Sequence, residues 1–252
     1  MHGDRVHRTG EDAAGPQIFR RLWKTGLLTP SDMRALAALP WRRELYEADM
    51  AIRCNEDFCI LASGLALRQR WDEDGSRQVL SLILPGDICT YSAITGHQSA
   101  STLSTVANSS MMRVSISDIA ELAERRPNIM AAILGNLAHD MATTEELLVL
   151  AGRRPAIVRI AHLFCELEYR LRRMGLARDA QYVLNLTQAE IGDHVALSAV
   201  HVNRTMQELR RRNLVRNRGP RFSLPDLGEL QRIARFSPAY LGETPDQWAA
   251  AE

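Results

Sequence analysis

A short stretch in the last third of the chain, residues 187–204, constrains the fold more than any other segment. Thr187 and Glu190 have the spacing of a capping box, in which each side chain satisfies a free backbone amide at the start of a helix. Gly192 is small enough for a second helix to cross the first closely, and Ser198 is a preferred residue at a helix start. This spacing predicts a helix-turn-helix.

The second helix of this motif carries one polar face, formed by positions spaced at i, i+3, i+4 and i+7. An arginine on that face can form a bidentate contact with guanine, and an asparagine or glutamine can pair with adenine. Side chains next to this face, and the free backbone amides at the start of the helix, are placed to contact phosphates. We therefore predict a DNA-contacting set that comprises Gln188, Ser198, Val200, His201, Asn203, Arg204, Gln207 and Arg218.

The segment around this face is strongly basic. Residues 198–221 contain seven arginines and a single acid, Glu208, which is typical of a surface that meets phosphates. Residues 214–224, with a turn at Gly219-Pro220, are predicted to form a small β-wing. The alternative is an ordinary helical hairpin with a solvated basic flank.

The first half of the chain has a different pattern. Between residues 45 and 114, short apolar runs are separated by turn residues such as Asp74-Gly75 and Pro85-Gly86-Asp87. This punctuation predicts an antiparallel sandwich or roll. Residues 18–39 form a short helical stretch before it, with a break and restart at Thr29-Pro30-Ser31-Asp32.

A long helix is predicted after Pro127. Its apolar residues follow a 4-3-4-3 spacing, which is the seam of a coiled coil, and a second apolar stripe lies beside this seam. One stripe can pack on the sheet while the other meets a partner helix, although a helix buried within one subunit is the alternative. The residues predicted to form a dimer contact are Met130, Leu134, Leu137, Met141, Thr144 and Leu148.

These segments predict an α+β fold in five parts. An N-terminal antiparallel β-roll precedes a long dimerisation helix and a C-terminal winged helix-turn-helix. The expected boundaries are a disordered N-terminus at 1–17, the roll at 18–116, the helix at 117–152, the winged helix at 153–225 and a C-terminal extension at 226–252.

Composition excludes several classes of protein. Apolar residues make up 46% and charged residues 24% of the chain, no apolar run is long enough to span a bilayer, and no signal-peptide core is found. We expect a cytoplasmic protein with reduced cysteines. Cys54 and Cys59 have the spacing of half a zinc finger but no second pair follows, so we interpret them as packed thiols, with a metal or redox role as the alternative, and predict no metal site.

The chain resembles the Crp/Fnr family of bacterial regulators over roughly residues 20–225. The resemblance is carried by residues 186–215 and by the roll signals at 61–64, 74–78 and 85–87. It implies a cyclic-nucleotide-binding-like roll that acts as a sensor, a homodimer on a two-fold symmetric DNA site, and RNA polymerase as a partner. Arg204 matches the guanine-reading arginine of the family, whereas Val200 replaces a base-contacting glutamate and Ala196 replaces a glycine.

The effector is not implied by the resemblance. The residues of the family that bind the ribose and phosphate of cyclic AMP are missing from 88–94 and 98–101, so we do not expect cyclic AMP to bind. An iron–sulfur cluster is not expected either, since no cysteine precedes Cys54. Haem bound through His97 or Cys89 is a remaining alternative, and no cofactor is predicted.

Two other functions are weighed against a DNA-binding regulator. A sensor or scaffold module could use the same helix-turn-helix to bind a protein, in which case its association with duplex DNA would be weak and insensitive to salt. An enzyme is not expected, because the chain shows no paired carboxylates on a placed motif, no glycine-rich phosphate loop and no nucleophile constellation.

Overall fold

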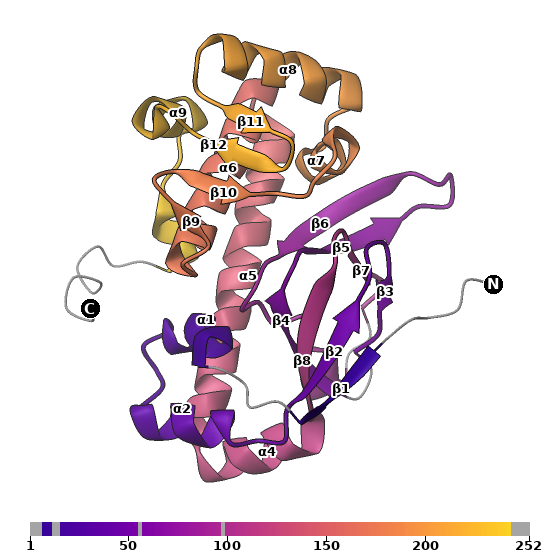
Figure 1. Cartoon of the computed structure of the whole chain (residues 1–252), viewed down its shortest axis with the longest axis vertical. Coiled ribbons are helices and arrows are strands. Elements are labelled where there is room, and N and C mark those ends of the chain that lie inside the picture. Colours follow the sequence, from indigo (N-terminus) through magenta and orange to yellow (C-terminus); the bar gives the residue numbers. More distant parts are fainter. Residues whose placement is uncertain (1–6, 12–15, 55–56, 97–98, 243–252) are drawn as a thin grey trace. The chain divides into compact units, whose positions relative to one another are not determined.

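The computed structural model describes residues 7–11, 16–54, 57–96 and 99–242 (Figure 1). The chain divides into two compact units, Met1–Leu137 and Ala138–Glu252. Helix α5 (Pro127–Arg153) contributes residues to both units. Within the described residues, none of the helices combines the length and the apolar character that crossing a membrane requires.

The first unit contains two four-stranded antiparallel sheets (Figure 1). One sheet has the order β1-β2-β8-β4, with the bounds β1 (His7–Glu11), β2 (Arg42–Tyr46), β8 (Ser109–Ser115) and β4 (Asp57–Ser63). The other has the order β3-β7-β5-β6, with the bounds β3 (Ala51–Ile52), β7 (Thr102–Thr105), β5 (Ala66–Trp71) and β6 (Arg77–Ile83). Residues of both sheets share one apolar cluster, as expected for the predicted roll.

The N-terminus differs from the sequence-based expectation. Residues 1–17 were expected to be disordered, but His7–Glu11 form strand β1, which pairs with β2 in an antiparallel register. Backbone groups make this pairing, so it needs no apolar side chains and leaves little trace in the sequence. Residues 1–6 and 12–15 lie outside the described part of the chain.

Short helices cover the first sheet and close a second apolar cluster around Trp41, whose indole N–H donates to the carbonyl of Leu36 at 2.9 Å. Thr29 begins one of these helices with a capping box, as the break signal in the sequence predicts. The elements are η1 (Pro16–Phe19), α1 (Arg20–Trp23), α2 (Pro30–Ala37), α3 (Ser92–Thr95) and α4 (Ile116–Arg125).

The segment 117–152, expected as a single dimerisation helix, falls within two helices. Helix α4 ends at Arg125 and α5 begins at Pro127. Arg126 between them has φ −138° and ψ 80°, because a residue that precedes proline is held out of the α-helical region. The apolar periodicity after Pro127 is confirmed as the long helix α5.

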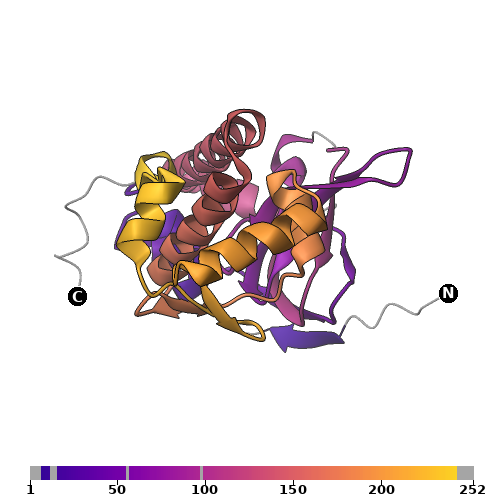
Figure 2. The same ribbon diagram turned by 90° about the horizontal axis from the view of Figure 1, so that it is seen from above.

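The second unit is built on helix α6 (Ala156–Arg173), whose apolar face is fully buried. Helices α7 (Gln188–Val195) and α8 (Ala199–Arg211) pack against it, and Figure 2 shows α8 lying across α6. A third sheet has the order β11-β12-β10-β9, with the bounds β11 (Arg216–Arg218), β12 (Arg221–Ser223), β10 (Gln181–Val183) and β9 (Ala177–Arg178).

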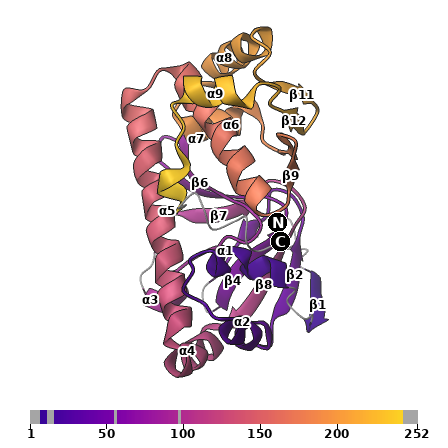
Figure 3. The same ribbon diagram turned by 90° about the vertical axis from the view of Figure 1, so that its left-hand side faces the viewer.

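The C-terminal residues pack into this unit as well. Helix α9 (Leu227–Ala234) lies against α6 (Figure 3), and the short helix η2 (Pro238–Leu241) follows it. The Tyr240 hydroxyl donates to the Glu166 carboxylate at 2.8 Å, and the Tyr240 ring stacks on His162. Residues 226–242, expected as a separate extension, are therefore part of the packed unit.

Candidate nucleic-acid interface

Helix α7 begins with the predicted capping box. The Thr187 hydroxyl accepts a hydrogen bond from the Glu190 amide at 3.2 Å, and the Glu190 carboxylate accepts one from the Thr187 amide at 2.7 Å. Two backbone amides that the helix leaves free are thereby satisfied. This arrangement fixes the residue at which α7 starts.

The turn between α7 and α8 is tight. The Leu197 amide donates to the Gly192 carbonyl at 2.9 Å, and a β-carbon on residue 192 would overlap the Leu197 carbonyl. Ala196 adopts the left-handed conformation with φ 56° and ψ 51°. Ser198 then caps α8 by accepting from the His201 amide at 3.3 Å. The predicted helix-turn-helix is confirmed at this level of detail.

The two faces of α8 are sharply different. Its inner face is buried against α6 and α7 through Val202, Met206 and Leu209, and this contact fixes which way the helix faces. Its outer face is exposed, and Val200, at 78%, is the most exposed large apolar side chain among the described residues. An exposed apolar group at the start of such a helix is available for contact with a base methyl group.

A row of amide side chains crosses the outer face. The Asn203 amide group donates to the Gln188 side-chain oxygen at 3.0 Å, and the Gln207 amide group donates to the Asn203 oxygen at 2.9 Å. The structure thus connects three residues of the predicted set from α7 and α8. Amide groups of this kind can donate to and accept from the edge of a base.

The arginines of this region fall into two groups. Four are held by neighbouring side chains: Arg210 by Asn217, Arg211 and Arg212 by Glu208, and Arg216 by Asn213. The other three have no hydrogen bond or ion pair to any described residue, and all are exposed: Arg204, Arg218 and Arg221. These three guanidinium groups are free to bind an external anion.

The predicted wing is present as the β11–β12 hairpin. Gly219 occupies its turn with φ 58°, where a glycine carries little penalty. Asn217 joins the wing to α8, because its side-chain oxygen accepts from Arg210 at 2.8 Å. Arg218 therefore lies on a hairpin that is braced against the same helix that carries Arg204.

The predicted dimer seam is the exposed face of α5. Leu134, Met141 and Leu148 are 56%, 62% and 73% exposed, and Leu137 and Thr144 are exposed as well, whereas Met130 is half-buried. The neighbouring stripe behaves differently, since Ile129 and Ile133 are buried in the interior of the first unit. An apolar row at heptad spacing is thus left uncovered within one chain.

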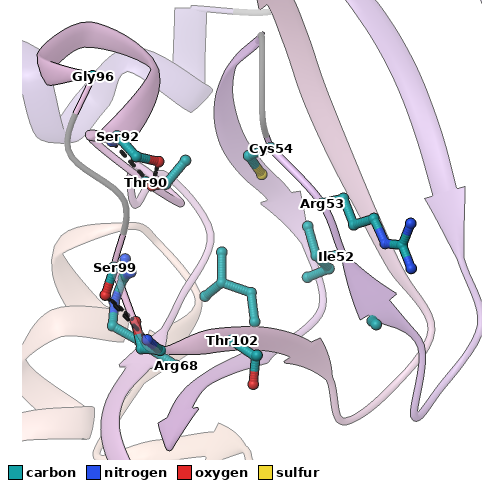
Figure 4. A pocket seen from close by; sticks show the side chains of 12 residues that line it. Ile52, Arg53, Cys54, Arg68, Thr90, Ser92, Gly96, Ser99 and Thr102 are labelled. Carbon is teal, nitrogen blue, oxygen red and sulfur yellow. Dashed lines mark hydrogen bonds between the residues drawn. The ribbon is translucent and has the colours of Figure 1, made fainter.

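The first unit contains a cavity of about 680 Å³ between its strands and helix α3 (Figure 4). Arg68 reaches it from β5, and its guanidinium donates to the carbonyl of Cys89 at 2.7 Å. Arg53 points away from it. Hydroxyl groups form much of the remaining lining, from Thr90, Ser92, Ser99, Ser101 and Thr102.

This lining does not suit a cyclic nucleotide in the manner of the family. Among the described residues that line the cavity there is no carboxylate to hold ribose hydroxyls, and the guanidinium of Arg68 is already bonded to the backbone. His97 and Gln98 lie outside the described residues. Cys89 is fully buried and does not line the cavity, so this structure shows no open haem ligand there. No group of three or more metal-binding side chains is found in the described part of the chain.

Comparison with known proteins agrees with this geometry. Residues 158–233 match the model of the Crp-like helix-turn-helix domain. The fumarate and nitrate reduction regulatory protein of Vibrio cholerae is 21% identical over 195 residues, which cover 77% of this chain and 76% of that protein. The anaerobic regulatory protein of Haemophilus influenzae is 22% identical over 170 residues, which cover 68% and 66% of the two chains.

The fold also has a close parallel among solved structures. FixK2 from Bradyrhizobium japonicum superposes with a TM-score of 0.68 at 20% identity, covering 77% of this chain and 98% of FixK2. A winged helix of this kind, together with such relatives, defines a DNA-binding transcriptional regulator. Residues 158–233 are thus similar to Crp-like helix-turn-helix domains, and the chain as a whole is similar to regulators of the Crp/Fnr type.

Proposed function

We propose that the protein binds a two-fold symmetric DNA site as a homodimer, with α8 in the major groove. The observation that carries this proposal is the exposed guanidinium of Arg204, which has no partner among the described residues and lies on the same outer face as the Asn203 and Gln207 amides. Because α8 is capped and packed on its inner side, its polar face needs little further ordering when DNA binds.

The contacts divide into base-reading and phosphate-binding groups. Arg204 pairs with guanine, Asn203 and Gln207 face adenine, and Val200 meets a thymine methyl group. Gln188, Ser198 and His201 lie at the helix ends, where they contact phosphates, and Arg218 does so from the wing. Since Ser198 and His201 bond each other at 2.9 Å, they act as a pair.

The homodimer forms through the exposed seam of α5, from Met130 to Leu148. Exposed leucine and methionine side chains at heptad spacing are stabilised when a second copy of the helix covers them. The two-fold axis then places two α8 helices on half-sites about one DNA turn, roughly 34 Å, apart. RNA polymerase is a further partner. The protein binds both the DNA and the polymerase in the cytoplasm.

The roll is the regulatory part of the protein, and the chain does not act as an enzyme. Its cavity is large enough for a small molecule and is lined by hydroxyl groups and one guanidinium. A ligand that binds one conformation of the dimer better than another shifts the population that is competent for DNA. The segment 152–155, which contains glycine and proline, is the hinge in this scheme.

Selection of bound sequences from a random duplex pool tests the proposal. A symmetric consensus with two half-sites about ten base pairs apart is the expected result. Affinity for the selected site should fall steeply between 50 and 200 mM salt, as counterions are released. Weak, salt-insensitive binding without a consensus would instead favour a module that binds a protein through the same motif.

A further inference from the structure

Three cysteines of the first unit converge in the interior of the roll. Cys54 follows strand β3, Cys59 lies in β4 and Cys89 follows β6, yet all three belong to one buried apolar cluster. The Cys89 amide donates to the Cys59 carbonyl at 2.8 Å. No disulfide is present, and Cys165 lies in the other unit.

The side chains of Cys54 and Cys59 are neighbours in this cluster. Both side chains belong to the same buried cluster, each shifts the pKa of the other, and the Cys59 thiol donates to the Asp57 carbonyl at 3.4 Å. A disulfide has an S–S bond length of about 2.05 Å, so the two neighbouring thiols must approach each other for the bond to form. Cys54 and Cys59 therefore form a pair that is placed for oxidation.

The guanidinium of Arg113 lies beside Cys54. The Nη2 atom of Arg113 lies 4.0 Å from the Cys54 sulfur and also donates to the carbonyl of Arg53. Arg113 is itself held by ion pairs to Glu44 at 2.9 Å and Asp57 at 3.2 Å. A fixed positive charge next to a sulfur stabilises its thiolate form.

The two sulfurs differ in access. Cys54 lines the cavity, on the opposite side from Thr90 and Ser92 (Figure 4), whereas Cys59 and Cys89 do not line it and are fully buried. A small molecule that enters the cavity therefore meets Cys54 first. Large reagents are excluded, because Cys54 itself is only 6% exposed.

The pKa shifts of the three thiols also distinguish Cys54 from Cys59 and Cys89. The hydrogen bond from Cys59, followed by the charges of Arg113 and Arg68, lowers the pKa of Cys54 despite its burial. The hydrogen bond with Cys54 and burial raise the pKa of Cys59, and burial raises that of Cys89. Cys54 is thus the thiol of the three that ionises most readily.

We propose that Cys54 is a peroxide-reactive thiol and that Cys59 resolves it into a disulfide, so that the roll contains a redox-modification site. The Cys54 thiolate attacks one oxygen of a small hydroperoxide, the O–O bond breaks, and the leaving oxygen takes a proton to become water or an alcohol. The Cys59 sulfur then attacks the Cys54 sulfenic acid, and the S–S bond forms. The hydroxide that leaves takes the proton of the Cys59 thiol and departs as water.

The tryptic cleavage sites around the pair separate it from the third cysteine, so a disulfide can be assigned by peptide mapping. Trypsin cleaves after Arg53 and Arg68, so Cys54 and Cys59 share one peptide, while Cys89 lies in the separate peptide 78–113. After treatment of the intact protein with hydrogen peroxide, we expect peptide 54–68 to lose two hydrogens and to resist alkylation. Further cleavage after Glu56 should leave its two pieces joined until a reductant is added.

Variants separate the two roles. Cys59→Ser should leave a sulfenic acid on Cys54 that dimedone traps, Cys54→Ser should abolish the disulfide, and Cys165→Ser should behave as the wild type. With untreated protein, a small alkylating reagent should modify Cys54 at least about tenfold faster than Cys165, as a lower pKa and an open cavity require.

Two results would overturn the proposal. One is a disulfide that joins peptides 54–68 and 78–113, which would assign the reaction to Cys89. The other is the absence of any disulfide in the wild type at peroxide concentrations that already oxidise its exposed methionines. Both results are measured on the wild-type protein, so they remain valid even if the Cys59→Ser variant does not fold. Neither result depends on DNA binding.

Discussion

The Leu197 carbonyl oxygen lies so close to the Gly192 α-carbon that no side chain fits on residue 192. The same two residues are joined by the hydrogen bond from the Leu197 amide to the Gly192 carbonyl at 2.9 Å. This close approach sets how tightly the chain turns between α7 and α8. The orientation of the outer face of α8 therefore depends on a glycine that contacts no ligand.

Gly192→Ala should destabilise the second unit by about 1–3 kcal/mol, because the added β-carbon forces the backbone of the turn to move. Urea unfolding measures the change. Gly152→Ala is the matched control: this position, also helical, has open space around it, so alanine should be neutral or should stabilise by about 0.5–1 kcal/mol. Equal effects of the two substitutions would show that the turn is not tight.

Ala196→Gly should stabilise the protein by about 1 kcal/mol, since Ala196 has a positive φ that costs an L-residue with a β-carbon. The control is Ala199→Gly in the first turn of α8, where φ is not positive and glycine should destabilise by about 0.5–1 kcal/mol. The two midpoints of denaturation should move in opposite directions. A shared loss of stability would contradict the left-handed turn.

The helix-turn-helix could be predicted from the sequence because its determinants are local. Thr187 and Glu190 are three residues apart, and a capping box needs nothing else. The lining of the cavity could not be predicted in this way, since Arg68 and Cys54 meet there from distant parts of the sequence. The spacing of Cys54 and Cys59 was interpreted as that of packed thiols, and the buried cluster that they share with Cys89 depends on long-range folding.

Three other features of the fold also escaped prediction. Strand β1 depends on backbone pairing with β2, which leaves no apolar pattern to detect. The packing of Tyr240 against His162 is a long-range contact within the second unit. The division of the arginines into paired and unpartnered groups depends on which neighbours Glu208 and Asn217 reach after folding.

Asp32→Asn should destabilise the first unit at neutral pH. Bonds from Thr29, Asn128 and Arg126 hold the pKa of the Asp32 carboxyl well below its usual range. A carboxylate with a depressed pKa stabilises the fold above the pKa of the unfolded state, about 3.9, and this contribution is lost as the pH falls below it. The difference between variant and wild type in urea unfolding should therefore shrink between about pH 5 and pH 3. A constant difference would contradict this account.

Leu137→Asp should shift the protein towards the monomer in sedimentation experiments, because it places a charge in the middle of the proposed seam of α5. Val149→Asp is the control, since Val149 is an exposed apolar residue of the same helix that lies off the seam. That variant should stay dimeric at the same concentration. If Leu137→Asp remains dimeric and Val149→Asp dissociates, the interface lies on a different face of α5.

Whether Arg204 reads a base is measured directly by the binding of variants to the selected site and to its single-base substitutions. Arg204→Ala should cost about 1–3 kcal/mol on the selected site and should abolish discrimination at one guanine position. Arg218→Ala, in the wing, should weaken binding to all sequences equally and reduce the salt dependence by about one phosphate contact. If Arg204→Ala also weakened every sequence by the same factor, Arg204 would be a phosphate contact and the proposed reading of bases would be wrong.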